Sequence, residues 1–204
     1  MLKGIYAITP NNLIEEDLFK VTNILLKRGI PFIQLRDKNR PKDEKIYLAK
    51  EIMKMAKGHQ TKIIINDDPY IAKQVKADGV HLGQEDASLI AARKLLGKDS
   101  IIGISCQDSL ELALKAKKMG ANYVAFGSIF TSKTKLDVSS CSLKRLTYLV
   151  NSINLTSVAI GGISKNNIKE LSKTNVDLIA ISSGLFQGDI EENLGKIENI
   201  YSSF

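Results

Sequence analysis

The sequence places an amide and two cations after an apolar stretch, in a spacing that suits phosphate binding. Gln34, Arg36 and Lys38 occupy alternate positions after the apolar segment Pro31–Ile33. Because alternate residues of a β-strand share one face, we expect these three side chains to point the same way. Arginine binds phosphate through two parallel hydrogen bonds, and lysine adds a point charge. The trio therefore indicates a phosphate site, with an ordinary solvated surface as the alternative.

Carboxylates follow the next two apolar stretches. Asp67 lies between Asn66 and Asp68, and Asp86 follows the stretch that contains His81. Two carboxylates beside phosphate-binding cations are typical of Mg²⁺ held between a protein and a pyrophosphate, because Mg²⁺ keeps several waters and accepts only one or two carboxylates. The alternative is that Asp68 and Asp86 cap the following helices, and the proline after Asp68 favours capping there. His81 is interpreted as a hydrogen-bonded core imidazole rather than a base.

Later segments add hydroxyls, amines and glycines that also suit phosphate. Ser105 ends an apolar stretch, and the polar segment Ser128–Ser140 has the length of a binding loop rather than a simple connection. Gly161–Gly162 and Ser182–Gly184 form turns after the last two apolar stretches, where helix N-termini bind phosphate through backbone N–H groups. The residues thus predict two anion sites, one from Arg36, Lys38, Asn66, Ser105 and Lys135 with a metal at Asp67 and Asp86, and one from the two late turns.

Short apolar stretches rich in Ile and Val alternate with longer segments of helical period along the sequence. The predicted strands are Ile5–Ile8, Phe32–Arg36, Lys62–Asn66, Gly79–Leu82, Ile101–Ser105, Tyr123–Gly127, Thr156–Ile160 and Leu178–Ser182. The predicted helices are Glu15–Lys27, Lys42–Lys57, Pro69–Val75, Ala87–Leu96, Ser109–Met119, Ser142–Asn151, Asn167–Lys173 and Ile190–Tyr201. We therefore expect successive pairs of one strand and one helix.

This succession favours an α/β fold, a single-domain (β/α)8 TIM barrel. Strands that are apolar throughout suit a parallel sheet covered by helices, and eight such units suit closure into a barrel, with an open doubly wound sheet as the alternative. Gly29, Gly97 and Gly120 stand where helices are expected to end. No linker divides the sequence, so we expect one barrel domain over residues 1–204. Its active site would lie at the carboxyl ends of the strands, where the polar residues above are found.

Composition excludes several other classes of protein. A hydrophobic content of 44% and a charged content of 25% exclude global disorder. The apolar stretches are too short for a membrane span and residues 1–10 lack the layout of a signal peptide, so we expect a cytoplasmic protein. Cys106 and Cys141 have neither zinc-site spacing nor the number for a disulfide framework. The net charge of +7 would attract nucleic acid or small phosphorylated substrates, but dispersed lysines and 6% aromatic residues argue against nucleic acid.

Together these motifs resemble those of the thiamine phosphate synthase (thiamine-phosphate pyrophosphorylase) family. The similarity extends through nearly the whole sequence and includes Tyr6–Thr9, Gln34–Lys38, Asn66–Asp68, Ala77–Asp86, Gly103–Ser105, Thr134–Lys135 and Ile160–Ile163. The resemblance implies a barrel transferase that joins 4-amino-5-hydroxymethyl-2-methylpyrimidine pyrophosphate to 4-methyl-5-(2-hydroxyethyl)thiazole phosphate. The products would be thiamine phosphate and pyrophosphate, and the cofactor would be Mg²⁺. Whether the protein forms a homo-oligomer is left open.

The resemblance also implies a role for each matching residue. The pyrimidine pyrophosphate would be bound by Gln34, Arg36, Lys38, Asn66, Ser105 and Lys135, of which Arg36, Lys38, Ser105 and Lys135 would be catalytic. Asp67 and Asp86 would hold Mg²⁺, and the thiazole phosphate would contact Ser132, Lys133, Thr134, Gly162, Ser182 and Ser183. A thiazole tautomerase-like or regulatory relative is the alternative. The tautomerases typically carry a His where this sequence has Ser128 and lack the full set of cations and paired aspartates, which favours the synthase.

Overall fold

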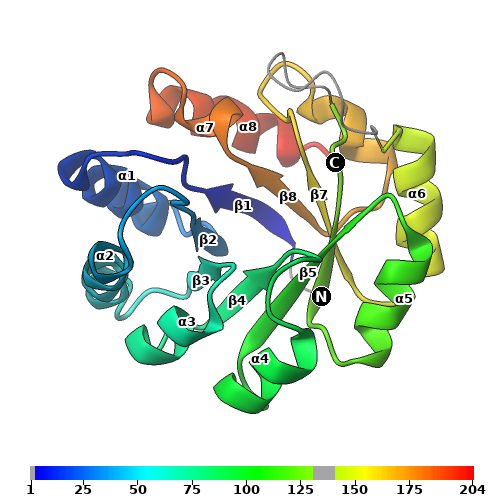
Figure 1. The fold of residues 1–204 in the computed structure, drawn as a ribbon. Helices are drawn as coiled ribbons and strands as arrows, with labels where there is room; N and C mark the ends of the chain where they lie inside the picture. The colour runs from blue at the N-terminus through cyan, green and yellow to red at the C-terminus, as the bar shows by residue number, and fades with distance from the viewer. Residues whose placement is uncertain (1–2, 131–140) are drawn as a thin grey trace.

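The structure, a computed structural model, describes residues 3–130 and 141–204, and its parallel strands close into a barrel in sequence order (Figure 1). The strands are β1 (Gly4–Ile8), β2 (Phe32–Leu35), β3 (Lys62–Asn66), β4 (Gly79–Leu82), β5 (Ile101–Gln107), β6 (Tyr123–Phe126), β7 (Thr156–Ile160) and β8 (Leu178–Ile181). Strand β1 pairs with both β2 and β8, which closes the sheet. The predicted (β/α)8 barrel is confirmed, and the open doubly wound sheet is excluded.

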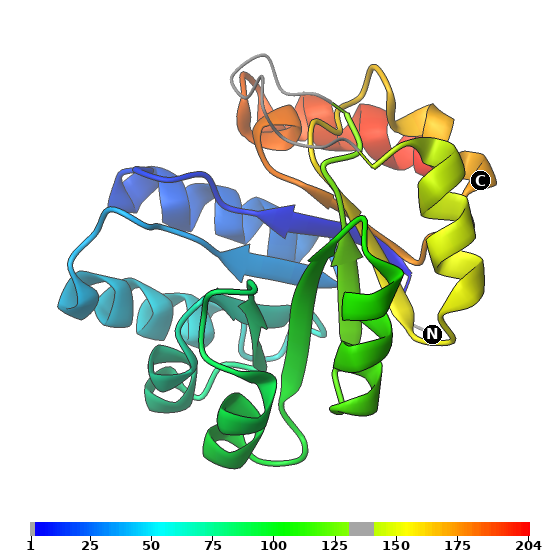
Figure 2. The ribbon, with the colours of Figure 1, turned by 45° about the vertical axis from the view of Figure 1, so that its right-hand side comes forward.

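Helices cover the outside of the barrel, as Figures 1 and 2 show. They are α1 (Glu15–Lys27), α2 (Lys42–Met55), α3 (Pro69–Val75), α4 (Leu89–Leu96), α5 (Leu110–Lys118), α6 (Leu143–Ser152), the 3₁₀ helix η1 (Ile168–Lys173), α7 (Ser183–Phe186) and α8 (Ile190–Tyr201). The sequence does not predict α7, because so short a helix cannot show a helical period. Within residues 3–130 and 141–204, no helix has the length and apolar character needed to cross a membrane.

Two differences in strand length affect the mouth of the barrel. Strand β2 ends at Leu35 rather than at Arg36, so Arg36 belongs to the loop at the mouth. Strand β5 continues past Ser105 to Gln107, and its register against β6 shifts between these two residues. Such bulges redirect side chains at the rims of barrels. The polar residues at both strand ends are thus presented by irregular backbone, which a period-2 pattern does not predict.

The apolar side chains form two layers, one inside the barrel and one between the strands and the helices. The inner layer contains the rings of Tyr6, Phe32 and Tyr123, which pack against one another in tilted or edge-on contacts. Gly103 makes room for them, because a Cβ there would lie 1.9 Å from Cζ of Tyr123. Branched aliphatic residues usually fill a barrel. Here, two phenol hydroxyls are buried instead, and each needs a hydrogen-bond partner.

The two aspartates considered as helix caps behave differently. Asp68 accepts hydrogen bonds from two backbone N–H groups in the first turn of α3, so the capping prediction is confirmed for it. Helix α4 begins later than predicted and is capped by Ser88, so the capping alternative is wrong for Asp86. The Asp86 carboxylate instead accepts a hydrogen bond from the backbone N–H of Gly83, within the loop after β4. Gly29, Gly97 and Gly120 follow α1, α4 and α5 with φ of +68°, +91° and +88°, as expected for residues that end helices.

Candidate active site

The end of β2 presents the three predicted phosphate-binding side chains in different environments. Gln34 is 2% exposed and lies inside the barrel, whereas Arg36 is half-buried and Lys38 is exposed in the loop that follows. Nη1 of Arg36 donates to Oδ1 of Asn11 at 3.0 Å, and the backbone N–H of Lys38 donates to the same oxygen at 3.1 Å. Asn11 therefore fixes both cation-bearing residues at the mouth.

Thr9 and Asn11, in the loop after β1, are site residues that the sequence analysis missed. Oγ1 of Thr9 accepts a hydrogen bond from the backbone N–H of Arg36 at 2.9 Å, and Thr9 is buried. Thr9 directly follows the first predicted strand, and Asn11 comes two residues later. The rule that polar residues at strand ends line the mouth of a barrel would have identified them.

We expect Asn11→Ala to weaken anion binding without unfolding the barrel. The substitution removes the acceptor that holds Arg36, and a hydrogen bond to a charged group contributes about 1.5 to 3 kcal/mol. Affinity for inorganic pyrophosphate, measured by titration calorimetry, should fall about tenfold, with the smaller value expected because the pair is partly exposed. Asn151→Ala, at an exposed position near the end of α6, is the matched control. Equal affinities for the two variants would contradict the positioning role of Asn11.

The two predicted metal ligands come from the ends of neighbouring strands. The backbone N–H of Asp67 donates to the carbonyl of His81 at 2.8 Å, which fixes the turn after β3 against β4. Oδ2 of Asp67 lies 3.3 Å from Nζ of Lys38. Oδ2 of Asp86 accepts from the backbone N–H of Gly83 at 2.7 Å. Burial raises the pKa of Asp86, and the adjacent Asp67 carboxylate raises it further.

Asp67 and Asp86 fit one divalent cation that keeps part of its water shell. Two adjacent carboxylates repel each other, and a divalent cation between them converts this repulsion into attraction. In the part of the chain that the structure describes, no group of three or more His, Cys, Asp or Glu side chains could hold a metal. An ion at the pair would complete its shell with water and substrate oxygens, which is the coordination that Mg²⁺ prefers.

A buried network of hydrogen bonds crosses the interior of the barrel. It comprises Gln34, Tyr6, Tyr123, His81 and Ser105, joined in that order. The distances are 2.8 Å from Nε2 of Gln34 to the Tyr6 hydroxyl, 2.8 Å between the two tyrosine hydroxyls, 2.9 Å from the Tyr123 hydroxyl to Nδ1 of His81, and 3.0 Å from Nε2 of His81 to Oγ of Ser105. Gln34 and Ser105, both predicted to bind substrate, are thus the two ends of one network.

His81 is a hydrogen-bonded core imidazole, as predicted. Both ring nitrogens have partners in the buried network, and the residue is 7% exposed. Burial lowers the pKa of His81 to about 4, so the ring is neutral at pH 7. Burial also raises the pKa of Tyr6 and of Tyr123, so both phenols keep their protons. The whole network is therefore uncharged at neutral pH.

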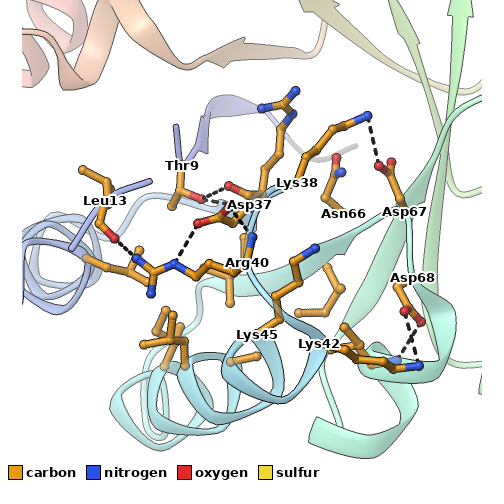
Figure 3. A pocket seen from close by; sticks show the side chains of 18 of the residues that line it. Thr9, Leu13, Asp37, Lys38, Arg40, Lys42, Lys45, Asn66, Asp67 and Asp68 are labelled. Atoms are coloured by element: carbon orange, nitrogen blue, oxygen red, sulfur yellow. Dashed lines mark hydrogen bonds and ion pairs between the residues drawn. The ribbon is translucent and has the colours of Figure 1, made fainter. Parts of the chain in front are cut away.

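A cavity of about 560 Å³ opens beside the mouth (Figure 3). Its floor is apolar and includes Leu35 of β2 and Ile65 of β3. Figure 3 shows Lys38 reaching toward Asp67, and Lys45 pointing from α2 into the same space. The residues that the cavity shares with the predicted site are Arg36, Lys38, Asn66 and Asp67, and its other charged lining residues are Arg40, Lys42, Lys45, Asp37 and Asp68. Arg40 pairs with Asp37 and Lys42 with Asp68, so the cations exceed the carboxylates by two, and this net positive charge favours an anionic ligand.

The turns after β7 and β8 lie side by side. Ser164 and Gly184 form a parallel bridge between them. Gly162 has φ of +63°, and a Cβ there would lie 2.3 Å from the backbone oxygen of Phe130, so the turn requires glycine. Ser182–Ser183 leads into the short helix α7. A phosphate site formed by the loops after strands seven and eight with a short extra helix is frequent in barrels of this kind.

Four predicted site residues, Ser132, Lys133, Thr134 and Lys135, lie outside the described residues. The residues on either side of that segment are tied together, because the backbone N–H of Cys141 donates to the carbonyl of Ser128 at 2.8 Å. The backbone N–H of Ile129 in turn donates to the carbonyl of Ile160 at 3.0 Å. The described residues that flank the segment therefore meet beside the end of β7.

Comparison with known proteins finds that this chain is similar to thiamine-phosphate synthases over most of its length. A family model described as thiamine monophosphate synthase matches residues 5–185. A thiamine-phosphate synthase of Chromobacterium violaceum is 38% identical over 188 residues, which cover 92% of this chain and 90% of that protein. One from Marinobacter nauticus is 42% identical over 192 residues, with coverage of 92% and 86%.

Solved structures show the same similarity. Thiamine phosphate pyrophosphorylase from Pyrococcus furiosus superposes with a TM-score of 0.86 at 33% identity, covering 98% of this chain and 95% of that one. A 3-hexulose-6-phosphate synthase from Salmonella typhimurium superposes with a TM-score of 0.74 at 16% identity, covering 99% of each chain. The second similarity is one of fold alone.

Proposed function

We propose how this chain, which belongs to the thiamine monophosphate synthase family, carries out the reaction of a thiamine-phosphate synthase. The enzyme is a transferase. Its proposed substrates are 4-amino-5-hydroxymethyl-2-methylpyrimidine pyrophosphate and 4-methyl-5-(2-hydroxyethyl)thiazole phosphate. The bond between the pyrimidine methylene carbon and the pyrophosphate oxygen breaks, and its electron pair leaves with pyrophosphate. The thiazole nitrogen then uses its lone pair to form the new C–N bond of thiamine phosphate.

The proposed task of Arg36 and Lys38 is to bind the pyrophosphate and to stabilise the charge that it gains on leaving. Preorganised cations are effective in this role because they need no rearrangement during the reaction. The shared contact of the two residues with Asn11 supports such preorganisation. Asn66 lines the cavity beside them and is proposed to contact the same substrate.

In this proposal, Asp67 and Asp86 hold Mg²⁺. The ion, when bound, supplies positive charge close to the leaving pyrophosphate. The two carboxylates and the neighbouring Lys38 support the assignment, because they form a mixed cluster of opposite charges at the mouth. The proposed role of the aspartates is to hold the ion in place and to leave most of its coordination positions to water and substrate.

The reaction needs no general base. The electron-rich aminopyrimidine can lose pyrophosphate to give a stabilised methylene cation, so bond breaking comes first and no proton must be removed from a nucleophile. The neutral His81, with both nitrogens hydrogen-bonded, supports this interpretation. We propose that Gln34 and Ser105 contact the pyrimidine pyrophosphate from the inner side of the mouth and hold it for attack.

The thiazole phosphate is proposed to bind at the turns after β7 and β8. Gly162 allows close approach of the backbone, and Ser182 and Ser183 bring hydroxyls next to α7. Ser132, Lys133 and Thr134 are proposed to contact the same phosphate, and Lys135 to contact the pyrophosphate. Because each phosphate has its own set of donors, the two rings would meet between them, over the open end of the barrel.

One observation carries the proposal. The loops after β2, β3 and β4 bring Lys38, Asp67 and Asp86 into one cluster, which is the arrangement that a metal-bound pyrophosphate requires. The purified chain should form thiamine phosphate, detected by chromatography, when both substrates and Mg²⁺ are present, and should form none when either substrate is omitted. Excess chelator should stop the reaction, and added Mg²⁺ should restore it. Binding of thiazole phosphate without product formation would instead favour the tautomerase-like or regulatory relative.

A further inference from the structure

We propose that Tyr6, Tyr123 and His81 are positioning residues that fix the direction of the Ser105 hydroxyl, so that its hydrogen points toward the substrate. The inference rests on the proposed role of Ser105 in binding the pyrimidine pyrophosphate. The three residues lie in the barrel interior, and they act on the reaction through Ser105 rather than by touching the substrate themselves.

The buried network leaves each hydroxyl few alternatives. Tyr6 is 1% exposed and Tyr123 is 2% exposed, so bulk water does not compete for their hydroxyls. Within the described residues, the Tyr6 hydroxyl has Gln34 and Tyr123 as partners, and the Tyr123 hydroxyl has Tyr6 and His81. A buried donor that lacks an acceptor destabilises the folded state. Each tyrosine must therefore both accept and donate within the network.

The direction of donation follows from the orientation of the Gln34 amide, whose Nε2 faces the Tyr6 hydroxyl at 2.8 Å. In this orientation the Tyr6 hydroxyl accepts, because Nε2 carries hydrogens and no lone pair for hydrogen bonding, and the opposite orientation of the amide would reverse the network. The single hydrogen of Tyr6 then has one acceptor in the network, the oxygen of Tyr123. Because Tyr123 accepts from Tyr6, its own hydrogen goes to Nδ1 of His81 at 2.9 Å.

The hydrogen bond at Nδ1 of His81 determines which ring nitrogen carries the hydrogen. Nδ1 accepts, so a neutral ring carries its hydrogen on Nε2. A ring whose Nδ1 accepts from Tyr123 cannot carry hydrogens on both nitrogens, so the geometry itself requires the neutral form. The Nε2–H group donates to Oγ of Ser105 at 3.0 Å. Ser105 thus accepts a hydrogen bond from inside the barrel, and its own hydrogen is left for a partner at the mouth.

A serine fixed in this way is a preorganised donor for an anionic group. Ser105 is half-buried at the end of the regular pairing between β5 and β6, where strand ends form the site. With the opposite direction, His81 would accept from Ser105, and the hydroxyl could only accept at the mouth, which would repel an anion. The direction of the whole network therefore decides whether Ser105 attracts or repels the pyrophosphate.

The first test measures which ring nitrogen of His81 carries the hydrogen. The sequence has 2 histidines, and the other, His59, is exposed, so His59→Gln leaves one imidazole to observe. A long-range ¹H–¹⁵N spectrum of the folded ¹⁵N-labelled protein at pH 7 should show hydrogen on Nε2 and none on Nδ1. Hydrogen on Nδ1 would overturn the proposed direction, and a doubly protonated ring would overturn it as well.

The second test asks whether Tyr123 acts through Ser105. Tyr123→Phe removes one hydroxyl and nearly no volume, and it should lower kcat about tenfold with a smaller change in KM. In a Ser105→Ala background the same change should have an effect of less than about twofold, because the hydroxyl that it positions is gone. Tyr148→Phe, the same substitution at an exposed position of α6, is the matched control and should leave kcat unchanged.

Independent effects of Tyr123→Phe and Ser105→Ala on kcat would indicate a structural role and overturn the inference. Tyr6→Phe provides a second cycle if Tyr123→Phe fails to fold, and a smaller effect is expected because Tyr123 can still donate to His81. An inactive wild-type enzyme would contradict the proposed function. The histidine spectrum would still show in which direction the hydrogen bonds of the buried network are donated. An active wild-type enzyme with independent effects would contradict the network inference alone.

Discussion

Arg36→Ala is expected to lower kcat about 100-fold while the barrel remains folded. The loss of one preorganised donor to a developing charge costs on the order of 3 kcal/mol, which corresponds to ~100-fold in rate. Arg36 is half-buried and held by Asn11, so its guanidinium is already oriented before substrate binds. Product formation with both substrates saturating measures the effect, and circular dichroism checks the fold.

Two further variants separate the charge of Arg36 from its geometry. Arg36→Lys keeps the positive charge but removes the planar guanidinium that can form two parallel hydrogen bonds to a phosphate, so kcat should lie between those of the wild type and Arg36→Ala. Lys118→Ala removes one exposed charge from the last turn of α5, at the opposite end of the barrel, and should leave kcat unchanged. Near-normal turnover in Arg36→Ala would remove Arg36 from the pyrophosphate site.

The barrel could be predicted from the sequence because each strand is buried on both sides and therefore reads as an uninterrupted apolar stretch. Lys62–Asn66, Gly79–Leu82 and Thr156–Ile160 agree with the observed strands at both ends. For helices with a clear apolar face, such as α1 and α8, the predicted and observed residues also agree at both ends. Two short elements, α7 and η1, were missed or assigned the wrong type, because they contain too few residues to establish a period. The short helix α3 agrees at both ends, because Asp68 and Pro69 mark its start in the sequence.

The candidate site was predictable where charge interrupts an apolar pattern and was missed where it does not. Asp67 and Lys38 stand out in the sequence as charged residues after apolar stretches. In the structure, Oδ2 of Asp67 lies 3.3 Å from Nζ of Lys38. Tyr6 and Tyr123 lie within apolar stretches, so they are indistinguishable from ordinary core residues until the closed barrel brings their hydroxyls together at 2.8 Å. A contact between residues 117 positions apart depends on the closure of the whole sheet, which local patterns do not encode.

Asp67→Asn and Asp86→Asn are each expected to raise the Mg²⁺ concentration needed for half-maximal activity about tenfold or more. The interaction energy of two unit charges about 4 Å apart is on the order of 1 kcal/mol in bulk water and about 4 kcal/mol near a protein surface. A loss of about 1.4 kcal/mol corresponds to a tenfold loss of affinity. Asn keeps the shape and one carbonyl oxygen, so the change isolates the charge. Asp99→Asn, at an exposed position before β5, is the matched control and should leave the metal titration unchanged.

Thermal unfolding gives a second measurement of the same prediction that does not depend on turnover. A ligand that binds the folded state raises the unfolding temperature, so saturating Mg²⁺ with pyrophosphate should stabilise the wild type and Asp99→Asn more than either site variant. Without metal, Asp67→Asn should not be less stable than the wild type. It removes the repulsion between two adjacent carboxylates, whereas the ion pair that it loses with Lys38 is largely exposed and contributes about 0 to 1 kcal/mol. Unchanged metal titrations and equal stabilisation in all four proteins would show that Asp67 and Asp86 do not hold the ion.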